Sequence, residues 1–198
     1  FNRDNVTLVD LRKGGIRSIT ARGICTEQAD HDLDAIVFAT GFDAMTGALR
    51  RIDVKGRGGV TLREVWDAEG PTSYLGLMVA GFPNLFIVQA PGSPSAATNF
   101  IAALEQHVEW IAECIGYLRT HGYRSIEAQA QAQHDWIEHT TALVEPTVLA
   151  DPSCNSWYNG ANVPGKKRRY MGYTAGIPEY RRRCDEVAAA GYAGFDLL

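Results

Sequence analysis

A long segment without charge constrains the fold of this chain more than any other feature. From Gly70 to Leu104 the sequence contains no Asp, Glu, Lys or Arg. Prolines and glycines interrupt it throughout, so no stretch reaches the roughly 18 consecutive apolar residues that a membrane-spanning helix requires. The segment is therefore expected in the interior of a domain, as strands over 74–79 and 85–89 followed by the start of a helix. A bound neutral or aromatic group is expected beside it.

The composition is that of a globular protein and narrows the classes of partner. The chain has 198 residues, is 45% hydrophobic and carries a formal net charge of −4. This length suits one domain or pieces of two. An acidic chain is a poor partner for nucleic acid or for an anionic membrane. The one basic run, Lys166 to Arg169, is interpreted as a solvated loop, with a phosphate contact as the alternative.

Cysteine and histidine spacings indicate neither a metal site nor a disulfide scaffold. The four cysteines are far apart and include no C-x-x-C pair, which predicts reduced thiols in a cytoplasmic protein. His134 and His139 are five residues apart, whereas two ligands on one helical face need a spacing of three or four. The first ten residues contain neither an initiator Met nor the apolar core of a signal peptide. The chain is thus expected to begin inside a domain.

Hydrophobic patterns predict strands in the first part of the chain. Short strands are expected over 6–9, 16–21 and 22–26, with a glycine turn before the second. Apolar residues follow one another directly over 35–39. That pattern is typical of a strand covered on both faces in a parallel or mixed sheet.

Helical spacing dominates the second half. A short helix is expected over 62–66. A longer one should bury a stripe of apolar residues spaced by three and four and end at Gly122; the stripe consists of Ile101, Leu104, Val108, Ile111, Ile115 and Leu118. Another helix is expected to start at Ser125 as its N-cap, and a last one to cover 179–190. Together these elements predict an α/β fold.

Thr40 and Gly41 end the predicted buried strand and form the first candidate binding position. A glycine at the carboxyl end of such a strand lets a cofactor approach the backbone without meeting a Cβ atom. The Thr40 hydroxyl can donate to a phosphate or ribose oxygen. A simple turn is the alternative interpretation.

The second candidate is the start of the helix after the charge-free strand over 85–89. The helix is expected to begin near Pro94 or Ser95, with Ser93 as a cap. A helix N-terminus carries free N–H groups and a partial positive charge. Because the segment has no Lys or Arg, a reduced flavin suits this end better than a phosphate, which usually recruits a basic side chain.

The loop over 151–178 is the third candidate. It concentrates Trp157, Tyr158, Tyr170 and Tyr173 among glycines and asparagines. Such a loop can form a lid over a planar ligand. Alternatively, the aromatic side chains anchor a long loop to the surface.

Four segments in this order resemble the C-terminal part of Baeyer–Villiger monooxygenases of the phenylacetone, cyclohexanone and steroid group: "DAIVFATGFDAMTGAL", "GFPNLFIVQAPGSPSAATNF", "EQHVEWI" and "SWYNGANVPGKKRRYMGY". The resemblance implies a fragment of a flavoprotein with two dinucleotide-binding domains, FAD and NADPH as cofactors, and a ketone and O2 as substrates. It further implies insertion of one oxygen through a C4a-peroxyflavin to give an ester or lactone. Residues 1–40 would be the end of the NADPH domain, and 41–198 the C-terminal part of the FAD domain.

The resemblance also implies roles for particular residues. Thr40, Gly41, Phe42 and Asp43 would mark the crossing between the domains at the cofactors. Asn99 and Phe100 would lie beside the flavin. Ser95, Ala96, Ala97 and Met171 would line the substrate pocket. Trp157 would reach the nicotinamide–ribose end of NADPH, and Lys166 would have a minor role near a cofactor.

Departures from the family pattern limit what this chain can do alone. Its sequence has neither G-x-G-x-x-G fingerprint, and the family's active-site arginine falls before the stretch matching Phe1. We therefore expect no catalytic residue in these 198 residues and no turnover by the chain on its own. The alternatives are a flavin-containing monooxygenase that oxygenates amines or sulfides, and a non-catalytic flavoprotein remnant.

Overall fold

The computed structural model describes residues 1–94 and 98–198. The predicted pocket residues Ser95, Ala96 and Ala97 lie outside these ranges. The chain divides into two compact units, Phe1–Gly41 and Phe42–Leu198. Among the described residues, no helix combines the length and apolar character needed to cross a membrane.

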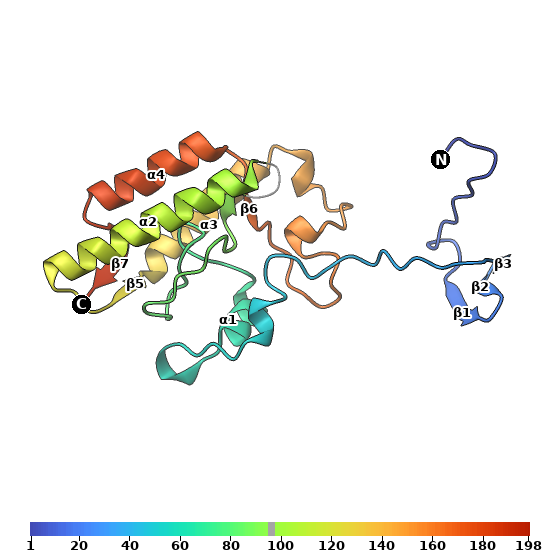
Figure 1. Ribbon diagram of the computed structural model, residues 1–198, viewed down its shortest axis with the longest axis horizontal. Helices are drawn as coiled ribbons and strands as arrows, with labels where there is room; N and C mark the ends of the chain where they lie inside the picture. The colour runs from blue at the N-terminus through green and yellow to red at the C-terminus, as the bar shows by residue number, and fades with distance from the viewer. Residues whose placement is uncertain (95–97) are drawn as a thin grey trace. The chain divides into compact units, whose positions relative to one another are not determined.

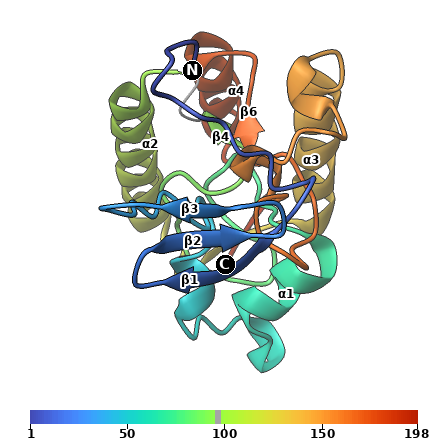
Figure 2. The same ribbon diagram turned by 90° about the vertical axis from the view of Figure 1, so that its right-hand side faces the viewer.

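The first unit is a small antiparallel sheet. Its strands β1 (Ile16–Thr20), β2 (Gly23–Thr26) and β3 (Asp30–Asp32) lie side by side in sequence order (Figure 2). The strands expected over 16–21 and 22–26 are thereby confirmed. The strand expected over 6–9 is wrong, because these residues form no ladder with any described segment.

The buried strand expected over 35–39 is also wrong. These residues have no regular structure, and Val37 and Phe38 are 88% and 68% exposed. A strand requires a neighbour to bond to its backbone, and none of the described segments supplies one here. The apolar pattern is real, but its partner is not among these residues.

The second unit buries the charge-free segment, as predicted, but not as strands. Leu75, Leu77, Met78 and Val79 are at most 1% exposed. The backbone reverses at Leu75 and Gly76, both of which have positive φ, so the strand expected over 74–79 is wrong. A Cβ atom on Gly76 would lie 2.4 Å from the Cβ of Ser93, which explains the need for glycine.

The stretch over 85–89 likewise forms no strand, although it packs against this turn. Ile87 N donates to Leu77 O over 2.8 Å, and Ala90 N donates to Gly76 O over 3.0 Å. These isolated bonds replace a continuous ladder because the turn at 75–76 bends the partner backbone away. The segment is therefore a buried, irregular, backbone-bonded layer.

Helices surround this layer (Figure 1). They are α1 (Leu62–Glu69), α2 (Phe100–His121), α3 (Ala130–Val144) and α4 (Ile177–Ala189). The helices expected over 62–66 and 179–190 and the end of α2 at Gly122 are confirmed. Short 3-10 turns are η1 (Leu49–Arg51), η2 (Arg57–Gly59), η3 (Val148–Ala150) and η4 (Trp157–Asn159).

Two short strand pairs join distant parts of the second unit. β4 (Ser93–Pro94) pairs in parallel with β6 (Gly172–Tyr173), and β5 (Ile126–Ala128) pairs antiparallel with β7 (Phe195–Leu197). These pairs correct two predicted helix starts. Ser93 and Pro94 belong to β4, and α2 begins later, after Asn99. Ser125 precedes β5 and does not cap α3, whose N-cap is Gln129.

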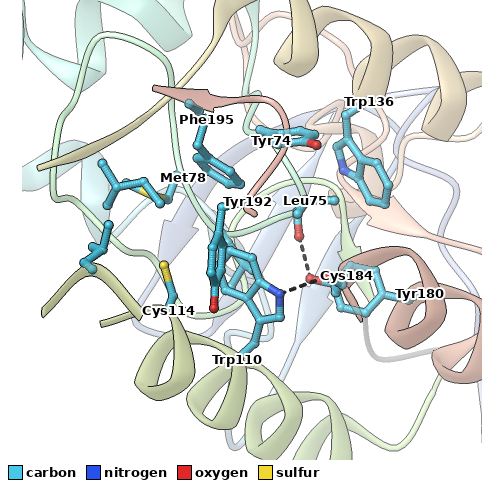
Figure 3. Close-up of a cluster of buried hydrophobic side chains, with 14 of the residues drawn as sticks. Tyr74, Leu75, Met78, Trp110, Cys114, Trp136, Tyr180, Cys184, Tyr192 and Phe195 are labelled. Carbon is cyan, nitrogen blue, oxygen red and sulfur yellow. Dashed lines mark hydrogen bonds between the residues drawn. The ribbon is translucent and has the colours of Figure 1, made fainter. Parts of the chain in front are cut away.

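The core is built from aromatic rings on three helices, on the charge-free segment, on β6 and near the C-terminus (Figure 3). Trp110 of α2 donates its indole N–H to Cys184 O of α4 over 3.0 Å and contacts Tyr192 edge to face at 5.2 Å. Trp136 of α3 stacks on Tyr173 at 5.4 Å. Aromatic contacts of this kind add to the stabilisation from burial.

The predicted buried face of α2 is confirmed only in part, because Leu118 is buried and Ile111 packs against the core. Its core-facing residues are Ala103, Gln106, His107, Trp110, Cys114 and Leu118. Of the expected stripe, Ile101 is 62% and Val108 56% exposed. The helix therefore has two apolar faces, and the one carrying Trp110 meets this chain's core.

Candidate cofactor site and its loop

The predicted binding residues Thr40 and Gly41 end the first unit. Both are exposed, and Gly41 has a φ of +80° with no atom near the position of a Cβ. Phe42, the first residue of the second unit, is 88% exposed. The role predicted for Thr40 and Gly41 stays a prediction.

A tight turn fixes Asp43 at the start of the second unit. Met45 adopts a φ of +66°, and Gly47 N donates to Asp43 O over 3.1 Å. A Cβ atom on Gly47 would lie 2.3 Å from that carbonyl oxygen, so only glycine fits. The turn places the Asp43 carboxylate against the loop that contains Lys166.

Asp43 and Lys166 form a largely buried ion pair. The Lys166 ammonium donates to Asp43 Oδ1, and its side chain is only 4% exposed. Arg50 lies 3.8 Å from Asp43 Oδ2 and also pairs with Asp67 of α1. Positive and negative groups alternate through these four residues, so the cluster has no net charge.

The remaining cations of the basic run bind the chain's own oxygens. Lys167 donates to Ala68 O over 2.7 Å, and Arg169 donates to Glu69 O over 3.1 Å. Arg168 donates to Pro152 O and Asn155 Oδ1, each over 3.0 Å. The run therefore fastens the loop to α1 and to the loop's own beginning, which the interpretation as a freely solvated loop did not anticipate.

The aromatic residues of the loop form a stack. The Trp157 and Tyr158 rings are 3.9 Å apart at 21°, and the Tyr158 and Tyr170 rings are 5.8 Å apart at 14°. Trp157 is half-buried. Met171 N donates to Tyr158 O over 2.8 Å, and Met171 itself is 1% exposed. The stack gives the loop an internal structure of its own.

The N-terminus of α2 is accessible. The Asn99 side chain accepts a hydrogen bond from Ala102 N over 3.3 Å, so Asn99 caps the helix. Phe100 is 43% exposed. No acidic residue occupies the first turn, so the partial positive charge of the helix end is not neutralised from within.

Sequence reasoning missed a buried polar chain behind this helix end. Gln89 N donates to His107 Nδ1 over 3.1 Å, and His107 Nε2 lies 2.7 Å from the Tyr180 hydroxyl, which in turn donates to Leu75 O. Since Nδ1 accepts, the single proton of the neutral ring is on Nε2. Burial lowers the pKa of His107 to about 4. The available sequence signal for a buried His107 was its position on the same face of α2 as Trp110.

The Gln89 side chain adds an unsatisfied donor. Gln89 has a φ of +60° and is 8% exposed. Its Oε1 accepts from Ser93 Oγ over 3.3 Å, but its buried Nε2 has no hydrogen-bond partner among residues 1–94 and 98–198. A buried amide N–H without a hydrogen-bond partner destabilises the folded chain. A bound ligand that accepts this bond would remove the cost, which is why such groups often lie at binding sites.

The described residues contain no cluster of three or more His, Cys, Asp or Glu able to hold a metal ion. All four cysteines are free thiols. The candidate features of the second unit are an accessible helix end, a buried amide and a fastened aromatic loop.

Solved structures define the class of this fold. The closed crystal structure of cyclohexanone monooxygenase matches with a TM-score of 0.90 and 43% identity, over the whole chain and 36% of that protein. Oxidized steroid monooxygenase bound to NADP matches with a TM-score of 0.85 and 47% identity, again over the whole chain and 36% of that protein. The fold is that of the C-terminal part of these Baeyer–Villiger monooxygenases, which confirms the predicted fold class.

Proteins with similar sequences belong to the same class of enzyme as these structures. Acetone monooxygenase (methyl acetate-forming) of Gordonia sp. (strain TY-5) is 46% identical over the whole chain, and cyclohexanone 1,2-monooxygenase of Acinetobacter sp is 39% identical. Phenazine N-monooxygenase of Lysobacter antibioticus is also 39% identical. No family model matches. The chain spans only 36–37% of these relatives' length. It corresponds throughout to the C-terminal part of Baeyer–Villiger monooxygenases, as the resemblance predicted.

Proposed function

We propose that this chain is the C-terminal portion of an FAD- and NADPH-dependent Baeyer–Villiger monooxygenase. The reaction converts a ketone, O2, NADPH and H⁺ into an ester or lactone, NADP⁺ and water. The match to closed cyclohexanone monooxygenase over all of this chain is the observation that carries the proposal. A cytoplasmic location belongs to the proposal and is supported by the free cysteines.

The residues present suit a flavin near the start of α2. FAD would supply the transfer of electrons from NADPH to O2. The partial positive charge of the helix end, which no acidic residue in the first turn offsets, favours a ligand group that carries negative charge. The buried Gln89 Nε2 has a free proton to donate, and His107 holds the backbone N–H of the same residue. Asn99 and Phe100 are therefore the proposed flavin contacts.

The loop suits the nicotinamide nucleotide. Trp157 and its stacked neighbours provide a planar apolar surface that excludes water from a bound ring. The ion pair of Lys166 with Asp43 is neutral overall and leaves no free cation at Lys166 for a phosphate. We propose that Thr40, Gly41, Phe42 and Asp43 lie at the crossing between the NADPH and FAD domains, and that residues 95–97 and Met171 line the substrate pocket.

A chimera tests the proposed activity. The C-terminal 37% of the Gordonia acetone monooxygenase would be replaced by this chain. We expect ketone-dependent NADPH oxidation with one ester formed per NADPH, measured by absorbance and product chromatography. The chain alone, supplied with FAD and NADPH, should form no ester. A folded, flavin-bound chimera that oxidises none of a panel of linear and cyclic ketones would contradict the proposal.

A second candidate is oxygenation of an aromatic ring nitrogen. It is supported by the phenazine N-monooxygenase, which is as similar to this chain as the Acinetobacter ketone enzyme is. The same chimera would be assayed with phenazines and with ketones. N-oxide formation without ester formation would favour this candidate.

A further inference from the structure

We propose that Asp43 and Lys166 act as a pair of positioning residues that hold the Trp157 loop in place, and that Lys166 does not bind a cofactor phosphate. This inference rests on the proposed function and deepens it. It assigns a role to two residues whose charges would otherwise suggest direct nucleotide contacts. Its basis is the geometry of both partners.

Each partner is held before the pair forms. Asp43 sits in the tight turn closed by Gly47 N, and its carboxylate is only 26% exposed. Lys166 N donates to Val163 O over 3.2 Å, and the Lys166 side chain passes beside Gly160. An ion pair between two groups already in position loses little conformational freedom when it forms, unlike an exposed pair on flexible side chains.

A second bond joins the same two segments. Asn162 Nδ2 donates to Phe42 O over 2.9 Å. The turn at 42–43 therefore contacts the loop at Asn162 and at Lys166. Trp157 precedes these contacts by only a few residues, in η4, which is capped by Ser156. These two contacts hold the part of the loop that directly follows the aromatic stack.

Electrostatics separate this role from phosphate binding. A lysine that binds phosphate needs an uncompensated positive charge. Lys166 instead faces Asp43, and the next cation, Arg50, faces Asp43 and Asp67. Removing the Asp43 charge would free Lys166, so direct phosphate binding predicts that Asp43→Asn tightens NADPH binding. The positioning role predicts that it weakens binding.

The chimera with the Gordonia enzyme tests this directly. We expect Lys166→Met and Asp43→Asn each to raise KM for NADPH by about tenfold or more, because misplaced binding groups lose affinity steeply, with a smaller change in kcat. The conservative variant Lys166→Arg should keep KM within about threefold of the parent, since it retains the positive charge that faces Asp43. Lys55→Met, which removes an equal charge from an exposed pair with Asp53, should change KM less than about twofold because exposed ion pairs contribute little.

Hydrogen exchange in the isolated chain supplies a readout that needs no activity. Amides over 156–166 should exchange faster in Lys166→Met and Asp43→Asn, at parent rates in Lys55→Met, and near parent rates in Lys166→Arg. Unchanged exchange in both single variants would overturn the proposal, as would an Asp43→Asn chimera with unchanged or lower KM. If the parent chimera shows no turnover, the proposed function fails while exchange still decides the role of the pair.

Discussion

At the scale of single residues, His107 shows how a polar group can be part of a hydrophobic core. It is completely buried, yet both ring nitrogens have partners, on Gln89 and Tyr180. The ring accepts a hydrogen bond from the backbone N–H of Gln89. Because Gln89 has a positive φ and lies outside any helix or strand, secondary structure cannot supply that bond. Since the histidine accepts at Nδ1, protonation would place two N–H groups face to face.

His107 should make stability depend on pH. Its pKa is about 4 in the folded chain and about 6.5 when unfolded. The unfolded state therefore binds the extra proton first, and stability present above pH 6.5 is lost as pH falls towards 4. Between pH 7 and pH 5 the contribution of this residue should fall by about 2 kcal/mol, at 1.36 kcal/mol per pH unit.

Urea unfolding at both pH values checks this. His107→Gln should be less stable at pH 7 but lose about 2 kcal/mol less than the parent on acidification. His134→Gln changes an exposed histidine and should retain the parent's pH dependence. Equal losses in the parent and in His107→Gln would show that the ring titrates normally in the folded chain.

Residue-level prediction from sequence succeeded where a residue's chemistry is local. The end of α2 at Gly122 follows from short-range geometry. Asn99 became the cap in place of Ser93 because the chain first pairs with Gly172 and Tyr173, which are far away in sequence. His107 was missed because its partners, Gln89 and Tyr180, come from segments that no local pattern connects to it.

At the scale of elements, α2 shows why the spacing of aliphatic residues did not identify most of the helix face that packs against the core. Aliphatic residues repeat along one side of the helix, whereas Trp110, Cys114 and His107 occupy the other. Both patterns have helical spacing, so spacing alone does not decide between them. The aromatic face is buried here because α4 and the C-terminal strand β7 supply its partners.

Substitutions on the two faces of α2 should differ sharply in this chain. Val108→Asp, at an exposed position, should change the free energy of unfolding by no more than about 0.5 kcal/mol. Trp110→Ala should cost about 3–5 kcal/mol, through lost burial and loss of the hydrogen bond to Cys184 O. Chemical denaturation monitored by circular dichroism gives both values. A large effect of Val108→Asp would mean that the aliphatic face is buried.

At the scale of the whole molecule, the two units differ in how they are stabilised. Every buried hydrophobic residue of the described chain lies in the second unit. The first unit keeps its three strands together by backbone bonds, while Ile16 and Ile19 remain about half exposed. A small sheet without a core is marginal in water. The order of motifs predicted which enzyme class the chain matches. Neither the motifs nor the apolar periodicity predicted that the first unit would lack a hydrophobic core.

Hydrogen exchange should therefore separate the units. Amides of β1, β2 and β3 should exchange far faster than those around Trp110 and Cys114 in α2, because their opening requires no loss of core packing. Exchange of the 198-residue chain followed by mass spectrometry measures both. In the chimera the strands should become protected, since the added part of the protein can cover them. Equal protection of both units in the chain alone would refute this expectation.

The short parallel pair of β4 with β6 has a practical consequence for engineering. Ser93 and Pro94 directly precede the proposed pocket residues 95–97, and they are bonded to Gly172 and Tyr173, which directly follow Met171. A change of backbone at either strand is therefore transmitted to the other across almost eighty positions of sequence. Libraries that aim to alter substrate choice should randomise 93–97 and 171–173 jointly. If only one of the two stretches is varied, the unchanged strand still fixes the backbone position of its partner strand.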